Sequence, residues 1–232
     1  MRAAWVWLCL ASLSVSASGN STNSWSESVT STTSLAPGKP QTAYVKFNLL
    51  NADTKYPSVY VKFHTADCTD AGTKANYALY VGTLDERSRR LIHVTLPLKI
   101  DAEKKKFEPG QTENSVWFHL QGADAYYGKK CSESRAEDDV KRCWPTGNII
   151  FVQRESANPL DDGWKPSKIE IVVRYANPHS GLAEAIHSVH EFNPTCNKER
   201  ISENGFYRIG PDNIFEFLGE SKNVIQLGEP YY

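Results

Sequence analysis

Hydrophobic and polar residues alternate with a period of two in several short runs of this chain. The clearest runs are Val59 to Phe63 and Ala75 to Val81, which are joined by the Asp/Gly/Thr-rich stretch Asp67 to Thr73. This alternation is typical of paired strands that bury one face. A second pair is predicted at Ile149 to Val152 and Lys168 to Val173, separated by a loop that contains Asn-Pro and Asp-Asp-Gly.

Extended over the chain, the same pattern predicts seven short strands with turn-rich connections and no long helical pattern between them. This arrangement favours an antiparallel β-sandwich, an all-β fold class, over a parallel α/β sheet. The predicted strands are Ala43 to Leu49, Val59 to Phe63, Ala75 to Val81, Leu91 to Leu98, Ser115 to Leu120, Asn148 to Gln153 and Lys168 to Arg174.

The tail after residue 176 differs from this pattern and predicts a short C-terminal α/β extension, residues 177–232, packed on the sandwich. Leu182 to Val189 has apolar residues at helical spacing, which predicts one short helix. Phe206 to Ile209 and Ile214 to Leu218 predict two further strands across the turn Gly210 to Asn213.

The N-terminus carries a short basic start at Arg2, an apolar stretch from Ala3 to Leu13 and small residues up to Ala17. This pattern predicts a secretory signal peptide, residues 1–18, rather than a membrane anchor. Residues 19–40 follow as a flexible Ser/Thr-rich leader, which contains the N-x-Ser/Thr acceptor Asn20. We therefore expect a secreted, extracellular protein with no transmembrane segment in the mature chain, and glycosylation at Asn20.

Charge and cysteine content bear on the kind of partner and on the disulfides that this protein has. The chain has 26 Lys and Arg against 27 Asp and Glu, so no electrostatic argument points to a nucleic-acid partner. Four cysteines remain after signal cleavage, which predicts two disulfides with three possible pairings. We expect Cys131 to pair with Cys143, closing a charged insertion, and Cys68 with Cys196, tying the tail to the first turn.

Four landmarks, in order, resemble the PLAT (LH2) β-sandwich domain of lipoxygenases, pancreatic-type lipases, polycystins and stand-alone secreted plant modules. They are a strand that ends in Thr-Ala-Asp at Asp67, the following Ala-Gly-Thr-x-Ala-Asn, Phe107 to Thr112, and an Asp-Gly-Trp-x-Pro-x-x-Ile around Trp164. The resemblance covers residues 41–176 and leaves the insertion 124–146 and the tail unassigned. In the family's lipid enzymes catalysis resides in a separate domain, so the resemblance implies a binding module.

Relatives in this family coordinate calcium in the sandwich loops, and four carboxylates here occupy corresponding loops. Asp67 and Asp70 flank Cys68, and Asp161 and Asp162 precede Trp164. Calcium takes several oxygen ligands from flexible acidic loops, so these four aspartates form the candidate calcium site. The alternative is that they are turn formers whose side chains bond nearby backbone amides.

Aromatic and basic residues make a second candidate, a surface that contacts lipid headgroups or a secreted or cell-surface protein. Trp164 either plugs the sandwich edge or enters a headgroup layer. The insertion offers a richer set, in which aromatics and lysines together suit anionic headgroups or an acidic partner. Its alternative is a disulfide-pinned loop whose basic residues pair with nearby acids. The set comprises Tyr126, Tyr127, Lys129, Lys130 and Trp144.

The chain carries none of the familiar catalytic motifs, such as G-x-S-x-G, H-E-x-x-H or a phosphate-binding glycine loop. His179, His187 and His190 are the best metal-ligating alternative, because His187 and His190 would share a face of the predicted helix. We expect a non-enzymatic module that binds a lipid surface or a protein partner with calcium assistance. The alternatives are a protein-capturing factor that uses the insertion and tail, and a hydrolase with an unrecognised site.

Overall fold

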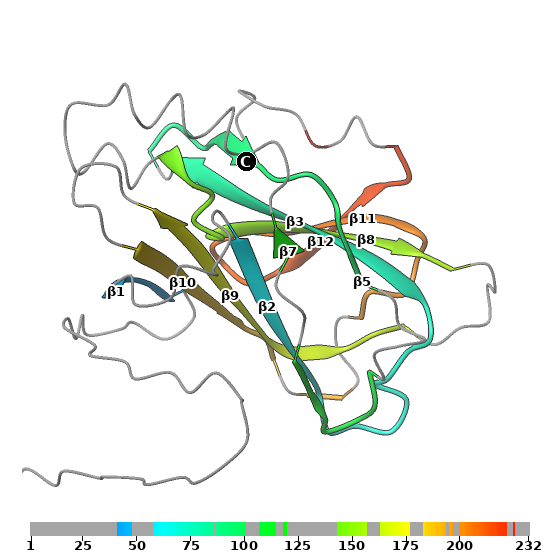
Figure 1. Ribbon diagram of the computed structural model, residues 1–232. Helices are drawn as coiled ribbons and strands as arrows, with labels where there is room; N and C mark the ends of the chain where they lie inside the picture. Colours follow the sequence, from blue (N-terminus) through cyan, green and yellow to red (C-terminus); the bar gives the residue numbers. More distant parts are fainter. Residues whose placement is uncertain are drawn as a thin grey trace, which may run out of the picture.

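The computed structural model describes residues 41–47, 58–85, 87–100, 107–114, 118–119, 143–156, 163–176, 183–193, 195–196, 200–221 and 225. For residues 41–47, 113–114, 118–119 and 176 the description covers the backbone alone. These residues form two six-stranded sheets (Figure 1) in which every strand pair is antiparallel. The predicted all-β class is therefore confirmed.

The first sheet has the strand order β1-β10-β9-β2-β6, with β7 also paired to β2. Its members come from both ends of the described chain. They are β1 (Gln41–Phe47), β2 (Ser58–Thr65), β6 (Thr112–Asn114), β7 (Phe118–His119), β9 (Pro166–Ala176) and β10 (Ala183–Glu191).

The second sheet has the order β12-β11-β8-β3-β4, with β5 also paired to β3. Its members are β3 (Asn76–Asp85), β4 (Arg90–Val94), β5 (Leu98–Ile100), β8 (Ile149–Glu155), β11 (Gly205–Ile209) and β12 (Phe215–Gly219). The single strand predicted from Leu91 to Leu98 is two strands here. Between them lies Leu96, which is 75% exposed.

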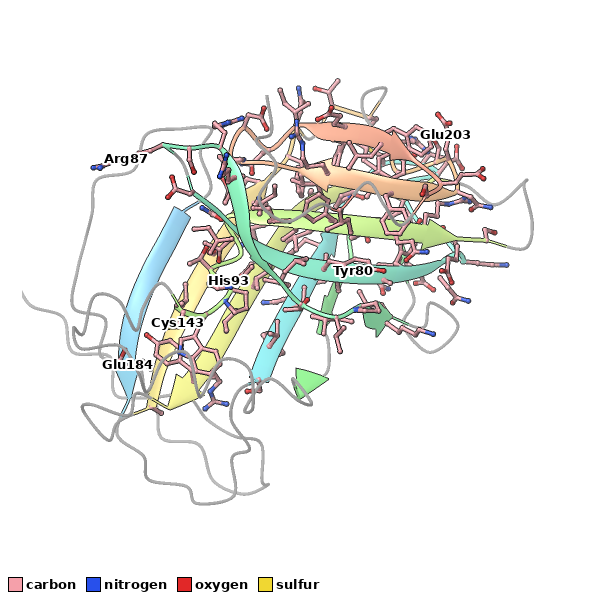
Figure 2. The ribbon with its side chains drawn as sticks, turned by 90° about the horizontal axis from the view of Figure 1, so that it is seen from above. Tyr80, Arg87, His93, Cys143, Glu184 and Glu203 are labelled. Carbon is pink, nitrogen blue, oxygen red and sulfur yellow. A yellow bond between two sulfur atoms is a disulfide. The ribbon has the colours of Figure 1, made fainter. Side chains whose placement is uncertain are left out.

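The two sheets pack face to face, and Figure 2 shows the strands of one sheet crossing those of the other. In β2 the buried residues Val59, Val61 and Phe63 alternate with partly exposed polar ones, as the sequence pattern predicts. Their side chains meet those of Leu79 in β3 and Val152 in β8 within one hydrophobic core. Period-two burial therefore sets which face of each strand points inward.

The second sheet is buried on its outer face as well. A separate hydrophobic cluster there includes Ala78 and Tyr80 of β3, Phe151 of β8 and Phe206 of β11, and Ile225 near the C-terminus packs against it. Strands β3 and β8 are consequently apolar on both sides, which is why they read as nearly continuous hydrophobic runs.

The described residues contain no helix long and apolar enough to cross a bilayer.

The predicted helix from Leu182 to Val189 is wrong, because this segment is β10 and lies between β1 and β9. The inward side chains of β10 include Glu184, Ser188 and His190, which are polar, buried and hydrogen-bonded. An inward face of this kind hides the apolar alternation that identifies a strand. The helical spacing is a coincidence that combines Ile186 of the inward face with Ala185 and Val189 of the outer face.

Residues 183–219, treated as an extension in the sequence analysis, contribute strands to both sheets. β10 is an inner strand of the first sheet, and β11 lies between β8 and β12 in the second. The two strands predicted in this region are present as β11 and β12, joined by a turn in which Asn213 has a φ of 58°. The candidate site below depends on this region for its closure.

Candidate functional site

Three loops that are far apart in the chain meet where β2 ends and β3 and β9 begin. Ala66 N donates to Lys165 O over 2.9 Å, and Lys165 N donates to Ala71 O over 2.9 Å. Gly110 N donates to Ala66 O over 3.1 Å, which brings in the third loop. We call residues 66–73, 107–111, 163–165 and 200–202 the loop end. The four sequence landmarks therefore converge on one place.

Trp164 forms the centre of the loop end and is 0% exposed. Its ring lies 4.9 Å from that of Phe107, 5.3 Å from that of Phe63 and 5.4 Å from that of Tyr77, measured between centroids. Such edge-on and tilted contacts are favourable arrangements for buried aromatic rings. Trp164 consequently plugs the sandwich, and its assignment as a headgroup or partner contact is corrected.

The C-terminal region closes the loop end through a disulfide and a guanidinium group. Cys68 is bonded to Cys196, which confirms the predicted pairing. Arg200 donates from its guanidinium to the backbone carbonyls of Asp70 and Thr69. The backbone amides of Trp164 and the residue opposite it, Ile201, also pair across a bridge. The turn at residues 67–70 is therefore fixed by the C-terminal region as well as by its backbone hydrogen bonds to the neighbouring loops.

Two glycines are required at the loop end, for different reasons. A Cβ added at Gly72 would lie 2.3 Å from the carbonyl oxygen of Phe107, closer than any non-bonded contact permits. Gly110 has a φ of 70°, a conformation that glycine adopts without steric cost. A positive φ therefore explains Gly110, whereas close backbone approach explains Gly72.

The candidate calcium ligands are placed only in part. Asp67 and Asp70 are exposed on the turn, and Asp70 adopts a φ of 64°, which aspartate tolerates better than most residues. Asp161 and Asp162 lie outside the described residues. Among the residues that the structure describes, no group of three or more His, Cys, Asp or Glu side chains is arranged to hold a metal ion. The four-carboxylate site stays a prediction.

The insertion candidates are also divided. Tyr126, Tyr127, Lys129, Lys130 and Cys131 lie outside the described residues, so their contact role and the pairing of Cys131 with Cys143 stay predictions. Figure 2 shows the buried Cys143 at the same side of the molecule as Glu184.

Trp144, next to Cys143 in the chain, is only 4% exposed. Its indole stacks on the ring of Tyr175 at 5.4 Å, and the Tyr175 hydroxyl donates to Glu184 Oε2 over 2.7 Å. The Trp144 side chain therefore packs in the hydrophobic core against Tyr175 of β9. Its assignment as a surface contact is corrected.

An ionic cluster on the outer face of the first sheet was not found from the sequence. His64 Nε2 lies 2.7 Å from Glu170 Oε1, and Lys168 Nζ lies 2.8 Å from the same oxygen. His187 Nε2 lies 3.6 Å from Glu170 Oε2. Burial raises the pKa of the Glu170 carboxyl, but hydrogen bonds from Lys168 and His64, together with the charges of Lys168 and Lys62, outweigh it, so the pKa falls below its usual value. The cluster links β2, β9 and β10.

His187 and His190 do not share a face, which corrects their assignment as a metal-ligating pair. An odd separation along β10 places them on opposite faces of the sheet. His190 points inward and is 0% exposed, with Nε2 2.6 Å from Gly147 O and Nδ1 2.9 Å from Asn213 Oδ1. Burial lowers the pKa of His190, although both hydrogen bonds act in the opposite direction. His179 lies outside the described residues.

A comparison of the chain with family models, curated proteins and solved structures finds no match.

The loop end is the best candidate for a binding site because it combines a rigid base with exposed polar groups. Its base consists of Trp164, the disulfide and three backbone connections. Asp67, Asp70 and Glu108 are exposed above this base, near the exposed cation Lys74. Acidic groups on a rigid loop attract cations and repel anionic surfaces.

Proposed function

We propose that this protein is a secreted, non-enzymatic binding module of the PLAT type that attaches to a lipid surface through its loop end with calcium assistance. The observation that carries the proposal is the meeting of the four landmark segments around Trp164. These segments extend over about a hundred positions of the chain, and each resembles a landmark of the family. Because they meet in space, the residues that resemble the family lie at one place on the molecule.

The disulfide between Cys68 and Cys196 supports the secreted part of the proposal. Stable structural disulfides form in oxidising compartments and are rare in the cytosol. The bond joins the loop end to the chain that follows β10, so it is a disulfide that stabilises the fold. It agrees with the signal peptide predicted at residues 1–18.

The charge of the loop end supports the calcium part. The loop end has three exposed carboxylates, Asp67, Asp70 and Glu108, against the cations Lys165 and Arg200, so a bound calcium ion would make its charge positive and attract anionic headgroups. The carbonyls of Thr69 and Asp70 already accept from Arg200. Carboxylate oxygens are therefore the ligands that the turn offers to a cation.

The test is sedimentation of the purified protein with phosphatidylserine vesicles and with phosphatidylcholine vesicles, each in calcium and in chelator. We expect pelleting with phosphatidylserine in calcium, and its loss in chelator. The double variant Asp67→Asn, Asp70→Asn should pellet weakly, because it removes two ligand charges while asparagine keeps the positive φ of residue 70 accessible. The matched control is Asp212→Asn in the turn between β11 and β12, which should pellet as the parent does.

Two results would overturn the proposal in different ways. Pelleting that is equal in calcium and in chelator would remove the calcium role and leave a lipid surface as partner. Absence of pelleting under all four conditions would remove the lipid surface and return the aspartates to turn formation. The search would then move to a protein partner of the insertion, residues 124–146.

A further inference from the structure

Two adjoining hollows lie on the surface of the second sheet, and the first is open to solvent over much of its extent. The first has a volume of about 480 Å³ and lies where β8 ends and β11 begins. The second has a volume of about 300 Å³ and lies over β3 and β5. Both are lined by Asn76, Gln153 and Glu155, so they form one continuous hollow, which we call the polar groove.

Amide and charged side chains line much of the polar groove, and the second cavity adds the apolar or aromatic residues Tyr77, Ala78, Pro97 and Ile100. Besides the three shared residues, the groove is lined by Arg154, Asn204 and Glu220 in the first cavity and by Tyr80 and Lys99 in the second. Two carboxylates, Glu155 and Glu220, are balanced by two cations, Arg154 and Lys99. The groove therefore has no net charge with which to attract an ion.

One wall of the groove is held in place by a chain of hydrogen bonds. The Tyr80 hydroxyl donates to Gln153 Oε1 over 2.9 Å, and Gln153 Nε2 donates to Glu155 Oε1 over 2.6 Å. Burial, followed by the charge of Glu155, raises the pKa of Tyr80, so its hydroxyl remains a donor at neutral pH. Gln153 has a second amide hydrogen and Glu155 a second oxygen, which leave capacity for a ligand.

A second wall is fixed in a similar way. Arg154 is 3% exposed and donates from Nη1 to Asn204 Oδ1 over 2.8 Å. Ser156 N donates to the same oxygen over 3.0 Å, and Asn204 Nδ2 donates to Ser156 O over 2.9 Å. Both walls are therefore preorganised before any ligand arrives, which lowers the entropic cost of binding.

We infer that the polar groove is a binding site for a neutral saccharide. A volume of several hundred Å³ is that of a small-ligand site. Closely spaced hydroxyls can both donate to carboxylates and accept from amides, whereas an apolar ligand would leave these groups without hydrogen bonds. An ionic ligand would find no net charge of the opposite sign. The occupant that satisfies the lining is polyhydroxylated and uncharged.

The test is calorimetric titration of the purified full chain with cellohexaose, xylohexaose, mannohexaose and maltohexaose. A heparin hexasaccharide and a chitosan hexamer serve as anionic and cationic probes. We expect one or more of the neutral hexasaccharides to bind, and Glu155→Ala or Asn76→Ala to weaken that binding by about tenfold or more. Both substituted side chains are exposed, so the fold should survive, and circular dichroism checks this. Glu191→Ala, exposed on the first sheet, is the control and should bind as the parent does.

Three results would overturn the inference. The neutral probes could fail to bind up to about 5 mM, a concentration at which even weak sites are detectable. A charged hexamer could bind more tightly than every neutral one, which would contradict the neutral class. Binding could also be unchanged in Glu155→Ala and Asn76→Ala, which would place the saccharide elsewhere. Asp67→Asn is expected to bind saccharide normally, so this experiment and the vesicle experiment fail independently.

Discussion

The indole nitrogen of Trp164 donates a hydrogen bond to Thr65 Oγ1 over 3.2 Å, although the two residues are 99 positions apart. Thr65 is the last residue of β2, and Trp164 comes two residues before β9 begins. The bond satisfies the one polar atom of a buried indole ring. It also aligns the ends of two neighbouring strands of the first sheet at the base of the loop end.

Removing the Trp164 side chain should be among the most destabilising single changes. Trp164→Ala is expected to lower the free energy of unfolding by about 3–5 kcal/mol, because it leaves a cavity among three aromatic rings. Thr65→Val should cost about 1 kcal/mol, the net value of one hydrogen bond. Urea denaturation measures both, with the exposed Leu96→Ala as a control within about 0.5 kcal/mol of the parent. A loss below about 1 kcal/mol for Trp164→Ala would contradict its role as a plug.

The disulfide between Cys68 and Cys196 should contribute strongly, because it closes a loop with a sequence separation of 128. The loop-entropy relation gives about 5 kcal/mol for a loop of this length. The double variant Cys68→Ala, Cys196→Ala is expected to unfold at a much lower denaturant concentration than the parent. Mass mapping of the parent protein provides the control that the two cysteines are joined. An unchanged unfolding midpoint in the variant would show that the tail is held by other contacts.

Gly72 and Gly210 make a matched pair for testing close backbone approach. Gly72→Ala should destabilise the protein by about 1–3 kcal/mol, because its methyl group would overlap the Phe107 carbonyl and force the loops apart. Gly210→Ala should be tolerated, since the nearest atom would be 3.4 Å away. Thermal unfolding of both variants measures the difference. Equal effects at the two positions would mean that the loop end yields more easily than its hydrogen bonds indicate.

His190 should make the stability of the protein depend on pH. Its pKa in the folded state is lowered from 6.5, so below that pH the unfolded chain binds a proton that the folded chain does not. The free energy of unfolding should therefore fall as the pH decreases from 7.5 to 5.5, by up to about 1.4 kcal/mol per pH unit.

The variant His190→Gln isolates this contribution, because glutamine does not titrate and can still donate to Gly147 O. We expect it to flatten the pH dependence, as measured by urea denaturation at several pH values. Leu96→Ala, an exposed change that removes no titrating group, is the control and should keep the slope of the parent. An identical slope in His190→Gln and the parent would assign the pH dependence to other groups.

Sequence reasoning succeeded where the chain obeys a simple burial rule. The alternation from Val59 to Phe63 placed β2 and its inward face, and the cysteine count led to the bond between Cys68 and Cys196. Local pattern failed at β10, because its inward positions are occupied by Glu184, Ser188 and His190. The burial of each of these is compensated by a specific hydrogen bond, and such partners are not visible from local sequence.

The candidate sites show the same division. The order of the landmarks indicated the loop end, and of the two roles expected for Trp164 the structure shows the plug. The cluster around Glu170 joins three strands, and the polar groove joins side chains from β3 and β8 with Asn204 before β11. Sites of this kind depend on strand order, which the pattern of single strands does not contain. Their residues become neighbours only after the sheets are assembled.

The pairing of β1 with β10 has a consequence during synthesis. The register joins Gln41 to Val189 and Phe47 to Ala183, so β1 is synthesised more than a hundred residues before the strand with which it pairs. β2 is likewise synthesised long before β9. The edge of β1 that pairs with β10 and the edge of β2 that pairs with β9 therefore stay uncovered until most of the chain has left the ribosome. Folding dominated by such distant pairings is slow and exposes strands to aggregation. We therefore expect the nascent chain to be most exposed to aggregation before residues 183–191 emerge.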